Sequence, residues 1–336
     1  MKRVLLLMTC LAFCLAFAIA ARGEDISSIA DAKIKGYIRQ LSDKKYAQSA
    51  RVKLASEGSK AVPYLLALLQ EAHVKSSTSS LAINVLGEIG DPKAVDFLVA
   101  TLQKNNVKLR RAAAAALGRI GDKKASEALK ERLNDYDPLV RINAVKSLER
   151  IGDPSVAGSL MKVVNDNNPE IRIYAVRALG NMKHLAAVES LSVLTSDIDA
   201  NVRLELTKAL GNISDAKCLP ALSILINDAH PNVRLAAVEA LGKIKTKDSF
   251  NILLQAAKSG DKEIRYYSTV ALGNLCYQES VPTLASLLTD ENTNIRIAAA
   301  EALAQIKTDD AKNALKTVLN DEISRVRNIA QEAVVQ

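Results

Sequence analysis

Arginine is the residue whose spacing in this chain could do chemistry. It recurs every 31 residues, at Arg110, Arg141, Arg172, Arg203, Arg234, Arg265, Arg296 and Arg327. A guanidinium group binds carboxylates and phosphates through charge-assisted, often paired, hydrogen bonds. The series therefore has two interpretations: structural bonds to carboxylates and turn carbonyls, or a track of cations that binds a phosphate-bearing ligand.

Aspartate recurs beside the arginines and favours the structural interpretation. Six residues before the arginine, six of the repeats carry Asp135, Asp166, Asp197, Asp228, Asp290 and Asp321. Lys104 and Ser259 take that place in the other two repeats. A phosphate-binding track would need arginine side chains that point outward and have no such partners. We therefore expect structural arginines.

Residues for catalysis are sparse. The three histidines, His73, His184 and His230, are followed by Val, Leu and Pro, so no His-Glu dipeptide occurs. HExxH, CxxC, a P-loop and GxSxG are also missing from the sequence. We expect no catalytic residues, no metal ligands and no cofactor.

The elements that position the arginines are pairs of helices. In residues 124–133 the apolar residues recur at helical spacing, the segment 134–138 interrupts them, and the pattern resumes over 139–151. Four residues before the arginine stand helix N-cap residues, at Asn106, Asp137, Asn168, Asp199, Asp261 and Asn292. Gly90, Gly121 and Gly152 suit the left-handed conformation that ends helices. Lys183, Ser214, Lys245, Cys276 and Lys307 replace this glycine later, so we expect the later helices to lack the clean glycine stop.

A fixed period of this length is typical of solenoids, in which each unit covers the apolar face of its neighbour. The pattern VRxxAxxALGxIGD followed by AxxxLxxxL resembles the HEAT-repeat family, in particular the short repeats named after phycobilisome lyases. The resemblance implies an all-α, right-handed α-solenoid of about ten helix pairs, with the arginine-bearing helices on the concave face. Residues 21–336 are expected to form one solenoid, with atypical repeats over 26–90 and regular repeats over 91–336.

The resemblance also implies that the repeated Asp and Arg residues form a hydrogen-bonded ladder between layers. Because Lys104 and Ser259 replace the aspartate six residues before Arg110 and Arg265, we expect the ladder to be weakest at those two arginines.

The N-terminus predicts export. Lys2 and Arg3 precede an apolar run, and Ala18 and Ala20 form an Ala-x-Ala-like cleavage pattern, so residues 1–20 are interpreted as a signal peptide. The alternative is a retained membrane anchor, because the run is close to the minimum length that spans a bilayer. The expected location is the periplasm or cell envelope, with secretion possible. Cys218 and Cys276 would remain, and their different repeat positions predict two free, buried thiols.

The partner surface is expected where the repeat varies. Positions −2, +2, +5 and +9 from each repeating arginine vary freely and share one face of the helix; we call them the variable stripe. Its candidate partner-binding residues are Lys108, Arg119, Lys146, Arg150, Tyr174, Arg177, Lys208 and Tyr267. The basic first half also carries Glu170 and Glu205, and the second half is mainly acidic. The stripe is either a solvated helix face or a groove for a protein partner.

These features predict a monomeric, non-catalytic scaffold that binds an acidic or extended segment of a protein. An enzyme or enzyme subunit resembling the phycobilin lyases is the alternative. Removing Lys2 and Arg3 leaves 43 basic and 37 acidic residues, a mild excess for a long surface. With no tryptophan to stack on bases, we expect no nucleic-acid partner. Membrane contact is expected only if the N-terminal segment is retained.

Overall fold

The computed structural model describes residues 26–71 and 73–335. The predicted signal peptide, with its alternative as an anchor, lies outside the described residues. Within these residues the chain is helical and has no β-strand. No helix in the described part is both long and apolar enough to cross a membrane.

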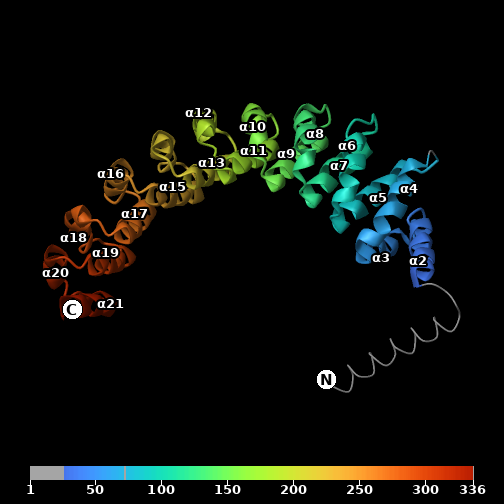
Figure 1. Ribbon diagram of the computed structural model, residues 1–336. Helices are drawn as coiled ribbons and strands as arrows, with labels where there is room; N and C mark the ends of the chain where they lie inside the picture. Colours follow the sequence, from blue (N-terminus) through green and yellow to red (C-terminus); the bar gives the residue numbers. More distant parts are fainter. Residues whose placement is uncertain (1–25, 72, 336) are drawn as a thin grey trace, which may run out of the picture. The chain divides into compact units, whose positions relative to one another are not determined.

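The helices follow one another in pairs (Figure 1). Their bounds are α2 (Ile26–Gln40), α3 (Ala47–Glu57), α4 (Val62–Gln70), α5 (Ser76–Ile89), α6 (Val95–Thr101), α7 (Val107–Ile120), α8 (Ser126–Glu131), α9 (Pro138–Ile151), α10 (Ala157–Val163), α11 (Pro169–Asn181), α12 (Val188–Ser192), α13 (Ala200–Ile213), α14 (Leu219–Leu225), α15 (Pro231–Ile244), α16 (Lys247–Ala256), α17 (Lys262–Leu275), α18 (Val281–Leu287), α19 (Thr293–Ile306), α20 (Asp309–Lys316) and α21 (Ser324–Val335). The described residues thus contain ten successive pairs, and the predicted α-solenoid is confirmed.

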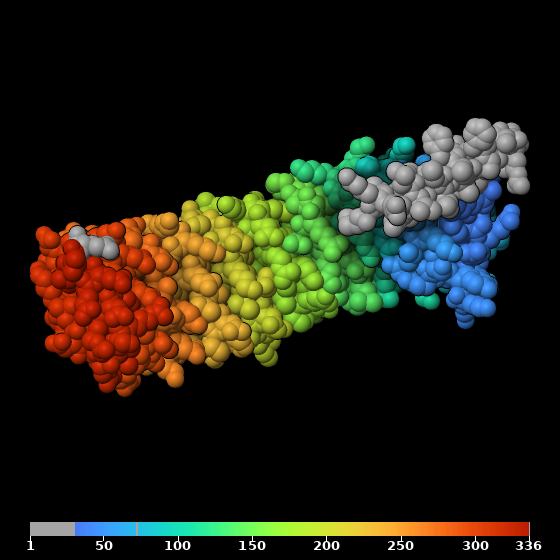
Figure 2. Space-filling model, turned by 90° about the horizontal axis from the view of Figure 1, so that it is seen from below, coloured from blue at the N-terminus to red at the C-terminus, as the bar shows by residue number. Residues whose placement is uncertain are grey.

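Two compact units divide the chain, Met1–Ile151 and Gly152–Gln336, which we call unit 1 and unit 2. In unit 1, α5, α7 and α9 pack side by side and form one layer, while α4, α6 and α8 cover them. In unit 2 the layer of arginine-bearing helices runs from α11 through α13, α15, α17 and α19 to α21. Figure 2 shows that successive repeats of unit 2 follow one another as a continuous surface.

Side-chain caps start the arginine-bearing helices as the sequence predicted. The Oδ1 atom of Asn106 accepts hydrogen bonds from the backbone N–H of Lys108 at 3.0 Å and of Leu109 at 3.3 Å. Equivalent bonds cap α9, α11, α13, α17 and α19. These bonds satisfy N–H groups that the first turn of a helix leaves without intrahelical partners, so the register of each helix is fixed locally.

Left-handed residues end the same helices. Gly90, Gly121 and Gly152 have φ of 74°, 75° and 63°, as expected for glycine stops. The later repeats keep this conformation without glycine, with φ of 50° to 60° at Lys183, Ser214, Lys245, Cys276 and Lys307. These repeats therefore lack the glycine, as expected, but they keep the left-handed turn, and a residue with a side chain bears the steric cost of that conformation.

The core follows the repeat. The leucine seven residues after each arginine is fully buried at Leu117, Leu148, Leu179, Leu210, Leu241, Leu272 and Leu303. One residue later, glycine lets neighbouring helices approach: a Cβ atom added to Gly180 would lie 2.6 Å from the Cα atom of Ala209. The arginine-bearing helices of unit 2 are therefore packed backbone to backbone at most junctions.

The two cysteines are free, as predicted, but only one is buried. Cys218 lies in the core, and burial raises the pKa of its thiol. Cys276 is exposed because it occupies the left-handed position after α17, where the chain turns at the surface. The prediction of a buried thiol at Cys276 is wrong.

Candidate functional site

The repeating arginines bind the turns that precede their own helices. Nη1 of Arg110 donates to the carbonyl oxygens of Lys104 and Asn105, both at 3.0 Å. All the other repeating arginines donate from Nη1 to the carbonyl six residues before them. Each guanidinium therefore closes its own turn with bonds to carbonyls that the turn leaves open.

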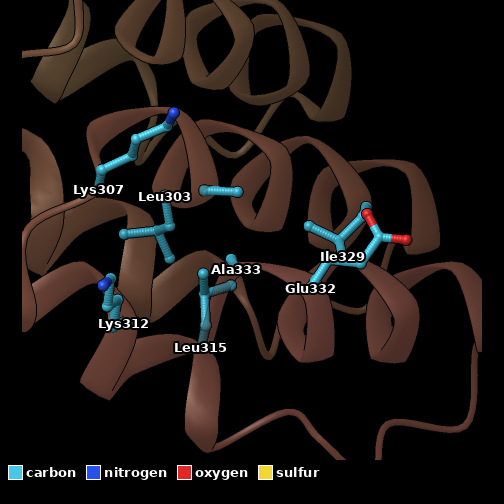
Figure 3. Close-up of a pocket in the computed structure, with 8 residues that line it drawn as sticks. Leu303, Lys307, Lys312, Leu315, Ile329, Glu332 and Ala333 are labelled. Carbon is cyan, nitrogen blue, oxygen red and sulfur yellow. The ribbon is translucent and has the colours of Figure 1, made fainter. Parts of the chain in front are cut away.

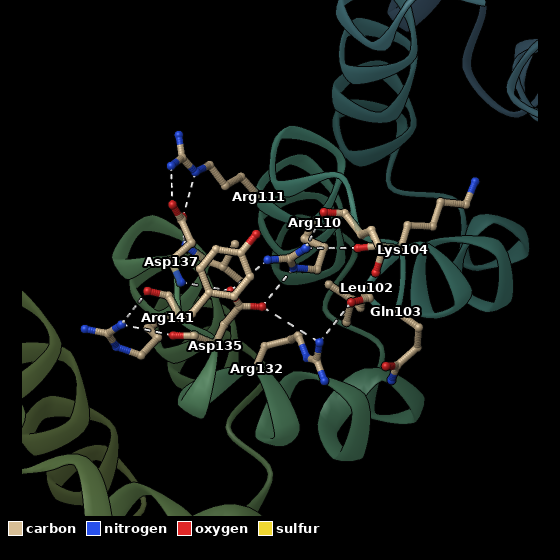
Figure 4. A network of polar contacts seen from close by, with 12 residues as sticks. Leu102, Gln103, Lys104, Arg110, Arg111, Arg132, Asp135, Asp137 and Arg141 are labelled. Atoms are coloured by element: carbon tan, nitrogen blue, oxygen red, sulfur yellow. Dashed lines mark hydrogen bonds and ion pairs between the residues drawn. The ribbon is translucent and has the colours of Figure 1, made fainter. Parts of the chain in front are cut away.

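The same guanidinium groups bind an aspartate of the following repeat. In unit 1, Nε and Nη2 of Arg110 donate to the two carboxylate oxygens of Asp135 at 2.8 and 2.9 Å (Figure 4). In unit 2, the same paired bonds join Arg172 to Asp197, Arg203 to Asp228 and Arg265 to Asp290. Nε of Arg296 is 3.4 Å from the carboxylate of Asp321. Paired geometry makes these the stronger class of charge-assisted bond.

The expected weak points of this ladder are wrong. The partner aspartate lies 25 residues after the arginine, so Lys104 and Ser259 do not remove partners from Arg110 and Arg265. The arginine that loses its partner is Arg234, because Ser259 stands where its aspartate would be. Arg234 instead lies 3.2 Å from the carboxylate of Asp261 and 3.0 Å from that of Glu263.

Burial and hydrogen bonding set the charge state of the ladder. The hydrogen bond from Arg203 holds the pKa of Asp228 below its ordinary value, against the effect of burial. Burial alone would raise the pKa of Asp135, but the bonds from Arg110 and the backbone N–H of Asp137 lower it. Both carboxylates are thus charged and paired at neutral pH. The side chain of Arg110 is only 5% exposed, so this guanidinium is not available to a ligand.

The stripe residues of unit 1 lie on α7 and α9. Lys108, Arg119 and Arg150 are exposed, and Lys146 is half-buried. Lys108 borders a shallow depression of about 390 Å³ that Ser77, Asn84 and Asn143 also line.

In unit 2 three of the predicted residues, Tyr174, Arg177 and Lys208, lie close together near Glu205. Nε of Arg177 on α11 donates to Glu205 of α13 at 2.8 Å, and Nζ of Lys208 donates to the same carboxylate at 3.2 Å. The guanidinium of Arg177 also lies 5.2 Å from the centre of the Tyr174 ring. We call Tyr174, Arg177, Glu205 and Lys208 the stripe cluster.

Glu205 is the centre of this cluster. From the sequence it was expected only as an acidic residue within the basic half of the stripe, not as a binding residue. Burial alone would raise the pKa of Glu205, but the hydrogen bonds and charges of Arg177 and Lys208 lower it. The side chain of Glu205 is 14% exposed, against 54% for Lys208. The cluster therefore presents an aromatic ring and a net positive charge to solvent.

Tyr267 does not join the stripe cluster. It lies on α17, where its ring makes an edge contact with Tyr266 at 5.2 Å between centroids. It lines an apolar groove of about 470 Å³ between α15 and α17. A second pocket, of about 440 Å³, lies between α19, α20 and α21. Sequence analysis missed both; the signals available were Val270 at a stripe position and Ala304 in the place of the helix-packing glycine.

No group of three or more His, Cys, Asp or Glu side chains is placed to hold a metal ion in the described ranges. Apart from the buried thiol of Cys218 and the helix cap Asp91, the described ionisable residues with shifted pKa values belong to the ladder, to the stripe cluster or to single pairs.

Comparisons with known proteins agree with this architecture. A family model described as HEAT repeats matches seven overlapping segments, at 38–116, 62–137, 95–169, 126–197, 157–216, 191–265 and 250–334. No curated protein matches significantly. An engineered protein of solved structure is similar at 20% identity and a TM-score of 0.51, covering 90% of this chain and 99% of its own. Human deoxyhypusine hydroxylase in complex with glycerol is 22% identical over 84% of this chain and 96% of its own, with a TM-score of 0.32.

Proposed function

The chain belongs to the HEAT-repeat family, and on that premise we propose that it is a non-catalytic scaffold of the periplasm or cell envelope that binds a protein partner along its variable stripe. A solenoid offers long surfaces on which each repeat contributes a few side chains. Here the repeating arginines hold layers together, so the residues that differ between repeats are the ones left to choose a partner.

The stripe cluster is the observation that carries this proposal. Tyrosine and arginine are among the residue types that contribute most of the binding energy in protein interfaces. Glu205 fixes the guanidinium of Arg177 beside the ring of Tyr174, and such preorganisation reduces the entropy lost on binding. The exposed ammonium of Lys208 adds attraction for an acidic segment, which steers association more than it adds affinity.

Export rests on the sequence of residues 1–20, with their basic start, apolar run and small residues before Ala21. N-terminal sequencing of the protein from a periplasmic fraction tests this part of the proposal. A mature chain that begins at Ala21 supports it, and an intact Met1 in the membrane fraction rejects it in favour of an anchor.

Affinity capture from an envelope extract tests the binding surface. Tyr174→Ala and Lys208→Glu should each abolish recovery of the partner that the wild-type chain recovers, because they remove the ring and the exposed cation of the cluster. Arg177 is left intact, since a carboxylate in its place would face Glu205 and disturb the fold. Lys217→Glu is the matched control: it makes the same charge change at an exposed position on the 3₁₀ turn before α14. Equal recovery by all variants would reject this surface.

A further inference from the structure

Two grooves border the variable stripe of unit 2. The first separates α15 from α17, and Leu235, Tyr267 and Val270 are among its walls. The second lies between α19, α20 and α21, where Leu303, Leu315 and Ile329 form the apolar part of the lining (Figure 3). Val270 is 37% exposed. Ile329 is half-buried, so each groove leaves an apolar side chain of the stripe partly in contact with water.

Departures from the repeat open both grooves. A Cβ atom on Gly180 or Gly273 would lie 2.6 to 2.7 Å from the nearest atom of the next helix, but on Gly242 it would lie 3.8 Å from Ala271. Helix α17 therefore stands further from α15, at the junction where Ser259 deprives Arg234 of its aspartate. At the second groove, Ala304 takes the place of the packing glycine and lines the groove.

The two grooves carry the same charges. Lys243 and Lys245 border the first, and Lys307 and Lys312 border the second. Each groove also has one glutamate, Glu239 or Glu332. Figure 3 shows Lys307 and Lys312 at one end of the second pocket and Glu332 at the other. None of the four lysines is in an ion pair with another described residue, so their charges are available to carboxylates of a ligand.

We propose that these grooves bind one extended segment of a partner protein, with a bulky aliphatic or aromatic side chain in each groove and an acidic residue beside each of these anchors. The apolar walls select the anchors, and the paired lysines select the carboxylates. The proposal rests on the proposed function. It adds which side chains of the partner the C-terminal part of the stripe would bind.

Helix spacing sets the separation of the two anchors. Two steps between neighbouring helices separate the grooves, roughly 16 to 20 Å at the usual spacing of packed helices. An extended chain covers about 3.3 Å per residue and points alternate side chains to the same side. The anchors should therefore stand about six residues apart, because an even spacing places both on the face that meets the stripe.

Synthetic peptides test this spacing directly. The probes are fluorescein-labelled serine- and glycine-rich peptides that carry two leucines, each followed by glutamate, at separations from about two to about ten residues. Fluorescence anisotropy with the mature chain should show the tightest binding near a separation of six, about tenfold tighter than at the shortest separation. Binding that is absent, or independent of the separation, would overturn the proposal.

Variants locate the binding. Val270→Asp and Ile329→Asp should each weaken the best peptide about tenfold, whereas Val193→Asp, at an exposed valine outside the stripe, should not. Lys243→Glu, which leaves the apolar walls intact, should also weaken it, and a peptide with lysine in place of glutamate should restore binding. If Lys243→Glu and the wild type bind the peptide equally, the lysines do not bind the acidic residues of the partner.

Two further outcomes distinguish the groove proposal from self-association and from the scaffold function. If Val270→Asp abolishes a concentration-dependent dimer, the grooves bind a second copy of this chain and the proposal is wrong. If the peptides fail while Lys208→Glu still abolishes partner capture, the groove proposal falls and the scaffold function stands.

Discussion

Each repeating arginine connects two repeats through one side chain. Nη1 bonds the carbonyls before its own helix, and Nε and Nη2 bond the carboxylate of the next repeat, as between Arg203 and Asp228. A lysine has no planar fork and could not make both sets of bonds. Removing one partner of such a buried pair leaves a desolvated charge, which is the costly way to break it. We therefore assign the arginines to stability and not to ligand binding.

Restoring the missing aspartate should stabilise the chain. Ser259→Asp gives Arg234 the carboxylate that the other arginines have, and should raise the free energy of unfolding by about 1 to 2 kcal/mol. Asp228→Asn, which removes an existing pair, should lower it by about 1 to 3 kcal/mol. Urea unfolding followed by circular dichroism measures both. If Ser259→Asp has no effect while Asp228→Asn destabilises, Arg234 is already satisfied by Asp261 and Glu263.

Acid should weaken the ladder. Because Arg203 lowers the folded-state pKa of Asp228, the unfolded chain binds the proton more readily, and the folded state gains stability as pH rises. This gain is fully present above the pKa of an unfolded aspartate, about 3.9, and is lost as pH falls through the lower folded-state pKa. Unfolding measured from neutral pH downward should show this loss, and Asp228→Asn should show less of it. An unchanged pH profile in that variant would contradict the assignment.

At the scale of helices, glycine decides how closely the arginine-bearing helices pack. A Cβ atom added to Gly180 would lie 2.6 Å from the backbone of Ala209, whereas one added to Gly242 would lie 3.8 Å from Ala271. Gly180→Ala should cost about 1 to 3 kcal/mol, because the methyl group forces the helices apart. Gly242→Ala should be neutral or stabilising by about 0.5 to 1 kcal/mol through helix propensity. Thermal unfolding compares the two; an equal loss in both would mean that the junctions are packed alike.

The lysines with positive φ allow a second test at the scale of helices, of what the left-handed helix ends cost in stability. Lys183 has φ of 50°, a conformation that costs a residue with a Cβ atom about 1 to 2 kcal/mol. Lys183→Gly should therefore raise the free energy of unfolding by about 0.5 to 1 kcal/mol after the added entropy of the unfolded chain. Lys217→Gly, an exposed lysine without positive φ, should lower it. If the free energy of unfolding falls in both variants, the Lys183 side chain makes a contact that stabilises the fold by more than the left-handed conformation destabilises it.

Much of this could be predicted from the sequence, because the period places the same residue type at the same point of each turn. Asn106, Gly121 and Leu117 reveal their roles through chemistry that is local to a single turn. The register of the ladder could not be predicted, since an aspartate six residues before one arginine is also 25 residues after the previous one. The grooves were missed because they depend on helix separations of an ångström or so, which Gly242 and Ala271 do not disclose from their identities.

At the scale of the whole molecule, the repeat separates stability from recognition. A repeat protein gains stability from each unit and from each interface with its neighbours. In both units the regular period of this chain supplies those interfaces, through the arginines, the buried leucines and the helix caps. Partner recognition is then assigned to positions where the residue type varies along the chain, such as those of Tyr174, Lys208 and Val270.

The most direct test of that division is site-specific photo-crosslinking with benzoylphenylalanine in place of tyrosine. Tyr174 belongs to the stripe cluster, whereas Tyr136, which is 74% exposed, lies in the turn before α9 beside Arg110. We expect a discrete covalent adduct with the captured partner from position 174 and none from position 136. An adduct from position 136 alone would contradict it, because recognition would then belong to the turns that the arginines hold and not to the variable stripe.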